Sequence, residues 1–369
     1  MSTYRSRRRT KRLIRNWIIF SVILAIVLSI GLYFLLRPKT HARMDDRISL
    51  TDISPSCEII PFSKGCVYID KTNGELYYID KSSNKLWGFS GVTQQMRAQA
   101  SDNRLAVYVS SKLQLISSEG ELLYSRIYDY PIRDVRVSDN VVVMLQTQGA
   151  QTCLIVTDKN GDIKDTIVQQ PNQTFLTYGI FSTDNKSVWL IYADTSSVTP
   201  VYRFVTYRYE ETKHITVSYS EFDQIIYAPV FLKDRISLLG SHEVINIDYT
   251  GKVLSRTRCV GYESKNINYG NVSKTLMLST VSDSFEAKKR VLCIPDSGIS
   301  YFIEEKDEII ATAVTDRYLY TFTPSALYSY DISSHFRTEY PLPEMVISVC
   351  VNGKLCYLKG DKVYRLELK

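Results

Sequence analysis

The chain has 369 residues, of which 44% are hydrophobic and 23% charged, and its formal net charge is +6. This composition excludes an intrinsically disordered chain, because it supplies enough apolar surface for a folded core. The positive charge lies in residues 1–16, whereas residues 37–369 carry 38 basic and 39 acidic residues. A nucleic-acid-binding body is excluded as well, since such a domain needs clustered excess Lys and Arg.

The first predicted element is a transmembrane helix over residues 17–36. This segment of 20 residues carries no charge, and as a helix it spans roughly 30 Å, the thickness of a bilayer core. The sequence that follows, Arg37-Pro38-Lys39, is not a small-residue cleavage site. The segment is therefore interpreted as an uncleaved signal-anchor, with a cleaved signal peptide as the alternative.

The basic tail of residues 1–16 predicts the orientation of this helix. Excess Lys and Arg stay cytoplasmic, so we expect the N-terminus inside the cell and residues 37–369 on the extracytoplasmic side of the cell membrane. The residues expected to determine this topology are Arg5, Arg7, Arg8, Arg9, Lys11, Arg12 and Arg15. Contact with anionic lipid headgroups fits the same tail. Residues 37–46 are interpreted as a linker.

Residues 47–369 contain a repeat that is typical of a β-propeller. A polar turn precedes a run of apolar and aromatic residues eight times, with markers at positions 65, 103, 140, 185, 234, 273, 316 and 353. The spacing matches a four-stranded propeller blade, which takes about 40–50 residues. Hairpin patterns such as LYYIDKSSNKLW (76–87) lie between the markers. Their Asp, Ser, Asn and Gly residues favour tight turns.

These patterns predict an all-β fold of eight four-stranded antiparallel blades. The last unit lacks a fourth strand, and the alternating stretch at residues 47–53 has no local partner. We expect this stretch to complete the last blade and close the ring, which protects the sheet edges. Seven blades is the alternative if the closing unit does not form a separate blade, and a pair of β-sandwiches is the alternative fold.

The hairpin at residues 76–87 resembles the signature of quinoprotein-like (PQQ-like and WD40-like) propellers, in which a strand ending in Asp, a turn and a strand ending in Trp recur. The Arg-rich start, single anchor and Tyr-rich propeller together look like an uncharacterised family of membrane-anchored propellers from clostridia-like Gram-positive bacteria. The resemblance implies no established activity. Quinoprotein dehydrogenases place vicinal cysteines in their channel, and no adjacent Cys pair exists in this sequence, so no cofactor is implied.

Residues with catalytic or metal-binding spacing are not found in the sequence. The histidines at positions 41, 214, 242 and 335 lie far apart, and no HExxH, Cys-x-x-Cys, Gly-x-Ser-x-Gly or phosphate-binding loop occurs. We therefore assign no catalytic, cofactor-binding or metal-binding residue. A glycosidase that assembles two carboxylates from different blades stays open as an alternative, because sequence spacing does not reveal such a pair.

The seven cysteines are expected on the extracytoplasmic side. Most lie inside apolar strands, where a thiol behaves as a small hydrophobic group, so we predict buried free thiols. An odd count leaves at least one unpaired, and a bridge between Cys57 or Cys66 and Cys350 or Cys356 is the alternative, because these pairs flank the predicted closure. The full set is Cys57, Cys66, Cys153, Cys259, Cys293, Cys350 and Cys356.

The sequence favours a non-enzymatic scaffold, sensor or binding module for an envelope protein or glycan. Exposed aromatic residues are frequent in protein interfaces, and the segment Tyr128-Asp129-Tyr130 is the candidate for a binding face. The alternative for these tyrosines is packing between blades. The alternative function is an enzyme acting on cell-wall carbohydrate, with carboxylates in the propeller channel.

Overall fold

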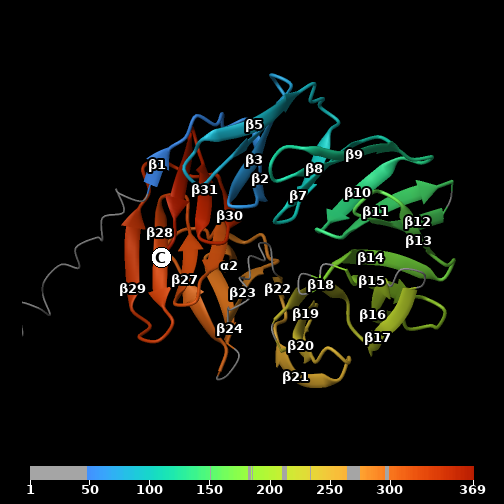
Figure 1. The fold of residues 1–369 in the computed structure, drawn as a ribbon. Coiled ribbons are helices and arrows are strands. Elements are labelled where there is room, and N and C mark those ends of the chain that lie inside the picture. The colour runs from blue at the N-terminus through green and yellow to red at the C-terminus, as the bar shows by residue number, and fades with distance from the viewer. Residues whose placement is uncertain are drawn as a thin grey trace, which may run out of the picture. The chain divides into compact units, whose positions relative to one another are not determined.

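In the computed structural model, the described residues form eight antiparallel sheets of four strands each. The structure describes residues 48–149, 151–181, 184, 186–209, 214–232, 234–263, 275–295 and 299–369. Residues Arg43–Lys369 form one compact unit, in which the sheets are arranged as blades around a central axis (Figure 1). The predicted all-β propeller is therefore confirmed, and the alternative of paired sandwiches is wrong.

The blades follow one another along the chain, and each is named by its order. Blade 1 contains β2 (Glu58–Phe62), β3 (Gly65–Asp70), β4 (Glu75–Ile79) and β5 (Lys85–Ser90), and blade 2 contains β6 (Arg97–Ala100), β7 (Arg104–Val109), β8 (Lys112–Ser117) and β9 (Leu122–Ile127). Blade 3 contains β10 (Ile132–Val137), β11 (Val141–Gln148), β12 (Gln151–Asp158) and β13 (Ile163–Val168). Blade 4 contains β14 (Gln173–Ile180), β15 (Val188–Asp194), β16 (Val201–Tyr209) and β17 (His214–Phe222).

The second half repeats the same plan. Blade 5 contains β18 (Ile226–Phe231), β19 (Ile236–Gly240), β20 (Glu243–Ile247) and β21 (Val253–Arg258). Blade 6 contains β22 (Tyr262–Glu263), β23 (Thr275–Thr280), the short helix α2 (Phe285–Lys288), β24 (Arg290–Pro295) and β25 (Tyr301–Glu304). Blade 7 contains β26 (Ala311–Val314), β27 (Tyr318–Phe322), β28 (Ala326–Asp331) and β29 (Arg337–Pro341). Blade 8 contains β30 (Ser348–Asn352), β31 (Leu355–Lys359), β32 (Val363–Glu367) and β1 (Ile48–Leu50).

Blade 8 closes the ring with strands from both parts of the chain. Its strand order is β1-β32-β31-β30, and Ile48 pairs with Leu366 while Leu50 pairs with Tyr364. The predicted closing strand is confirmed, and so is the count of eight blades. Seven is wrong, because β30, β31 and β32 form a sheet of their own with β1.

The first strand of each blade is the innermost one. Neighbouring first strands contact one another in the order β30, β2, β6, β10, β14 and β18. The second strands are almost fully buried, as in β3 and β15, since blades cover both of their sides. Clusters between blades hold the ring together, such as Tyr108 with Val142 between blades 2 and 3 and Tyr68 with Tyr357 between blades 1 and 8.

Successive connections in an antiparallel blade alternate between its two ends, which gives the ring two faces. The face that carries the loops from first to second and from third to fourth strands is called the turn face. The face that carries the loops from second to third strands and the links between blades is called the crossover face. Because β1 runs antiparallel to β32, it begins at the turn face of blade 8.

An indole ring links blade 1 to blade 2. Trp87 Nε1 donates to the carbonyl of Ser118 at 2.8 Å, and its ring lies over Gly120, where a Cβ atom would sit 2.6 Å from Trp87 Cγ. The turn needs glycine for a second reason, since φ of Gly120 is 86°. Tyr124 lies over Gly161 in blade 3 in the same manner, so the Trp of the hairpin pattern serves packing between blades.

All seven cysteines are free thiols. Six are buried, and Cys350 is half-buried. The prediction of buried free thiols is confirmed for these six, and no bridge joins Cys57 or Cys66 to Cys350 or Cys356.

The expected anchor at residues 17–36, the basic tail with its topology-determining residues and the linker at residues 37–46 lie outside the described residues. Within the part of the chain that the structure describes, no helix is long and apolar enough to cross a membrane.

Candidate binding site in the propeller channel

A pocket of about 270 Å³ lies among the inner strands of blades 2 to 5. Its wall contains the ends of β6, β10, β14 and β18, together with one residue of β15. Because first strands run toward the turn face, the pocket is at that end of the channel. The lining residues are Gln99, Ala100, Arg136, Val137, Thr177, Tyr178, Gly179, Ile180, Trp189 and Phe231.

Arg136 is the cation of this pocket, and Asp134 holds it in place. The two side chains are on one side of β10, two residues apart, as the period of a strand requires. Arg136 Nη1 donates to Asp134 Oδ1 at 3.0 Å and to the carbonyl of Val135 at 3.1 Å. Its Nε and Nη2 make no hydrogen bond to the described residues, and the side chain is 39% exposed. The guanidinium therefore keeps donors for a ligand.

Tyr178 contacts both members of the Asp134–Arg136 pair. Its hydroxyl donates to Asp134 Oδ2 at 2.9 Å, and its ring centroid lies 5.5 Å from the guanidinium carbon of Arg136, within cation–π range. Burial, and then the negative charge of Asp134, raise the pKa of Tyr178 well above its usual range. Tyr178 thus stays a neutral donor, and blade 4 orients a charged pair that belongs to blade 3.

Trp189 supplies a flat apolar wall with one polar atom. Gly179 makes room for it, since a Cβ atom at position 179 would sit 2.5 Å from Trp189 Cζ2. The ring centroid of Phe231 is 6.1 Å from that of Trp189. The indole Nε1 is buried and has no hydrogen-bond partner among the described residues. It is one of several buried side-chain polar atoms in the described residues that lack a hydrogen bond, and among them it is the one on a pocket-lining side chain.

Two further arginines lie on the same inner strands, toward the crossover face. Arg97 is the first residue of β6 and Arg133 the second of β10, and both are exposed. Arg97 Nη1 donates to the carbonyl of Arg133 at 3.3 Å. Neither guanidinium forms an ion pair with the described residues. The inner strands of blades 2 and 3 are thus locally basic, although residues 37–369 carry a net charge of −1.

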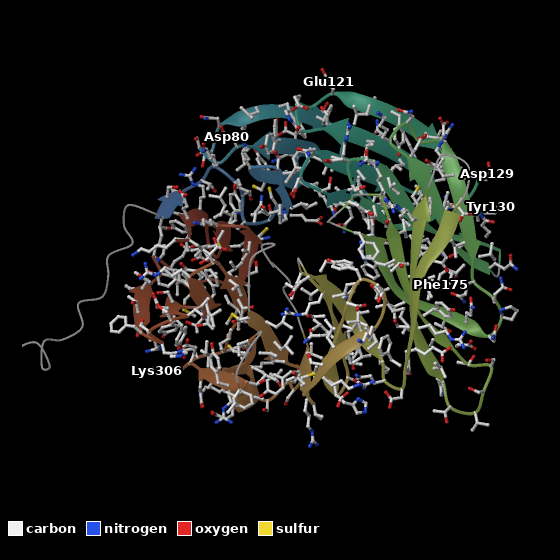
Figure 2. The ribbon with its side chains drawn as sticks, turned by 60° about the horizontal axis from the view of Figure 1, so that its bottom comes forward. Asp80, Glu121, Asp129, Tyr130, Phe175 and Lys306 are labelled. Atoms are coloured by element: carbon white, nitrogen blue, oxygen red, sulfur yellow. The ribbon has the colours of Figure 1, made fainter. Side chains whose placement is uncertain are left out.

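The predicted binding segment Tyr128-Asp129-Tyr130 lies in the link between β9 and β10, on the crossover face. Tyr128 is only 8% exposed and belongs to the cluster between blades 2 and 3, so its side chain packs between blades and is not available to a partner. Asp129 is exposed and Tyr130 is 40% exposed. Figure 2 shows both at the edge of the ring. The segment and the pocket are on opposite faces.

Sequence reasoning missed Arg136, Tyr178 and Trp189. They come from three strands of two blades, so no local motif contains them. A weak signal exists in the run Arg133-Asp134-Val135-Arg136, where charges interrupt an inner strand. In the structure, Asp134 and Arg136 of this run contact Tyr178 of the neighbouring blade.

Hydrolytic chemistry has little support at this place. The described lining contains no carboxylate, and Asp134, which contacts the lining residues Arg136 and Tyr178, already accepts a hydrogen bond from each. Acid–base hydrolysis of a glycoside needs two carboxyl groups about 5–10 Å apart. Among the described residues, no group of three His, Cys, Asp or Glu side chains has the arrangement of a metal site.

Comparison with solved structures identifies the same architecture in proteins of low sequence identity. BamB from Moraxella catarrhalis is 10% identical, with a TM-score of 0.58 over 87% of this chain and 98% of that chain. Sqt1 from Chaetomium thermophilum, bound to the N-terminus of ribosomal protein L10, is 11% identical, with a TM-score of 0.55 over 88% and 99%. Apo AztD from Citrobacter koseri is 12% identical, with a TM-score of 0.52 over 82% and 87%.

These likenesses show the fold alone, and they agree with the resemblance to quinoprotein-like propellers. No curated protein matches the sequence. A family model does match, over residues 36–367, which is nearly the whole chain. The chain belongs to DUF5711, a family of unknown function.

Proposed function

We propose that this chain is a non-enzymatic binding module, which holds a ligand or a partner segment in the channel pocket. The observation that carries the proposal is the pairing of Arg136, with donors left over, and Trp189, with an unpartnered N–H, in one pocket. Both side chains line the pocket, so a ligand held there would reach the remaining donors of Arg136 and the indole N–H of Trp189. The Sqt1 structure, which contains a bound segment of ribosomal protein L10, is an example of this type of role in a propeller.

We propose further that the propeller is tethered to the cell membrane of a Gram-positive bacterium by residues 17–36 and faces the envelope. The support is the uncharged segment and the seven basic residues before it. The chain enters the propeller at Ile48, at the turn face, where the pocket also opens. An envelope protein or glycan is therefore the expected class of partner.

Photo-crosslinking of the full chain in intact membranes tests the binding function. A diazirine-bearing lysine analogue replaces Gln99, which lines the pocket, and in a matched control it replaces the fully exposed Val198 on the crossover face. We expect one reproducible adduct from position 99, absent from position 198 and lost when Arg136→Gln is added. The proposal is wrong if position 99 gives no adduct, or gives one that does not depend on Arg136.

A further inference from the structure

We infer that the group recognised in this channel is a carboxylate, carried by a small ligand or by an acidic side chain of a peptide. The inference rests on the proposed binding function and gives its ligand a chemical class. It follows from the donors of the pocket, the charge of the inner strands and the size of the cavity.

The described lining of the pocket carries a guanidinium, a side-chain amide and an indole N–H, and no carboxylate. Arg136 keeps Nε and Nη2, a geometry that suits the two oxygens of a carboxylate. The side-chain amide of Gln99 makes no hydrogen bond to the described residues. Asp134 contacts Arg136 through Nη1 alone, and its Oδ2 also accepts from Tyr178, so the carboxylate orients the cation and leaves Nε and Nη2 open. An anion with two coplanar acceptors complements this set.

The charge of the surrounding strands also favours an anionic ligand. Arg97, Arg133 and Arg136 are opposed on β6 and β10 by one carboxylate, that of Asp134. Arg97 and Arg133 have no ion pair among the described residues, and this excess of positive charge on the inner strands raises the local concentration of anions. Arg133 and Arg136 are three residues apart on one strand, which separates their backbones by about 10 Å. An extended segment with acids three positions apart carries two carboxylates at a similar backbone spacing.

The size of the cavity limits what enters it. Its volume of about 270 Å³ is just below the range of roughly 300–1,000 Å³ for pockets that enclose drug-sized ligands. The rings of Trp189 and Phe231 provide an apolar wall, which suits the methylene groups of a Glu side chain. A ligand of amino-acid size, or one acidic side chain with its backbone, matches this space.

Calorimetric titration of the full chain in detergent micelles tests the inference with three probes. These are N-acetylglutamate, a capped Glu-Gly-Gly-Glu peptide and its Gln-Gly-Gly-Gln counterpart. We expect the acidic peptide to bind at least tenfold more tightly than the Gln peptide, and its affinity to fall as salt increases. Equal affinity for N-acetylglutamate and the acidic peptide identifies a small carboxylate as the ligand, whereas tighter peptide binding identifies a peptide.

Matched arginine variants make the test specific. Arg136→Gln should weaken binding of the acidic probes at least tenfold, and Arg97→Gln with Arg133→Gln should reduce the salt dependence. Arg258→Gln is the control, because Arg258 is exposed on the outer strand β21 and has no ion pair among the described residues. Equal binding of Glu and Gln peptides, or an unchanged affinity in Arg136→Gln, overturns the inference. If Glu and Gln peptides bind equally while position 99 still gives an adduct that depends on Arg136, the binding function stands and the carboxylate class alone is wrong.

Discussion

The hydroxyl of Thr51 donates to the carbonyl oxygen of Val363 at 2.8 Å, although the two residues are 312 positions apart in the chain. The Thr51 backbone N–H donates to the same oxygen at 3.0 Å. This contact follows directly on the pairing of β1 with β32, where both ends of the propeller share one blade. Closure of this kind leaves no free gap between the first and last blades.

Replacing Thr51 by Val should therefore weaken the closure without changing side-chain volume much. We expect Thr51→Val to lower the free energy of unfolding by about 1 kcal/mol, the usual net value of one hydrogen bond. Thr51→Ser retains the hydroxyl, so its free energy of unfolding should fall by less than that of Thr51→Val. Urea unfolding of the full chain, followed by far-UV circular dichroism, measures the stability of both variants. Equal unfolding midpoints for Thr51→Val and the parent would contradict a role of this hydrogen bond in closing the ring.

Much of the fold could be predicted from the sequence because each blade is specified locally. The hairpin at residues 76–87 contains its own turn signal and apolar alternation, and β4 and β5 occupy that segment. The closing strand was also accessible, since residues 47–53 alternate with no neighbour to pair with. Local patterns of this kind fix strands and their register before any contact between blades is known.

The site could not be predicted in the same way, because it depends on contacts between blades. Gln99 and Phe231 both line the pocket, yet more than a hundred residues separate them. Burial was equally hidden, as in Tyr128, which has the same type of polar neighbours as the exposed Tyr130. Glu305 lies in the charged run Glu304-Glu305-Lys306-Asp307-Glu308 and would be expected in solvent, but it is 4% exposed.

Glu305 is the centre of a buried polar network, and its removal should be costly. Its carboxylate accepts from Arg337 Nη2 at 2.7 Å and from the hydroxyls of Thr321 and Tyr330, each at 2.5 Å. Glu305→Ala leaves these donors without an acceptor, so we expect a loss of about 3–5 kcal/mol in the free energy of unfolding. The control is Glu308→Ala, at a partly exposed carboxylate, which should change it by less than about 0.5 kcal/mol. Denaturant unfolding measures both variants, and a similar loss in the free energy of unfolding for the two would contradict a stabilising role of the Glu305 network.

Gly120 combines a left-handed backbone with a close ring contact, and the chain offers a control that separates the two effects. Gly149 also has a positive φ, 64°, but nothing lies within 4 Å of the site of its missing Cβ. Gly149→Ala should therefore lower the free energy of unfolding by roughly 1–2 kcal/mol, from backbone strain alone. Gly120→Ala should cost about 1–3 kcal/mol more, because its methyl group collides with the Trp87 ring. Equal unfolding midpoints for the two variants would show that the contact with the Trp87 ring does not add to the loss of stability.

The turn aspartates should make the propeller sensitive to acid. Asp331 accepts hydrogen bonds from the hydroxyl of Ser333, from the backbone N–H groups of Ser333 and Ser334, and from Nε of Arg317. These hydrogen bonds, first of all that of the Ser333 hydroxyl, hold the pKa of Asp331 well below its usual range. A carboxylate with a lowered folded-state pKa stabilises the fold above its unfolded pKa, and this stability is lost as the pH falls toward the folded value. Asp331→Asn should therefore be less stable than the parent at pH 7, with the difference shrinking below about pH 4.

Urea midpoints at pH 7, 5, 4 and 3 measure this dependence. The control is Asp316→Asn in the same blade, because Asp316 is exposed and makes no hydrogen bond to the described residues. It should match the parent at each pH. A constant difference between Asp331→Asn and the parent across the series would contradict the linkage.

The thiols should be unreactive in the folded chain and fully countable after unfolding. Burial raises the pKa of Cys66, Cys293 and Cys350 to about 12 and that of Cys259 to about 11. The thiolate is the nucleophile, so a folded chain at pH 8 should react slowly with maleimide even at the half-buried Cys350. In urea without reductant we expect seven reactive thiols per chain. Five or fewer would reveal at least one disulfide, and fast labelling of the folded chain would show that the strands carrying these residues open readily.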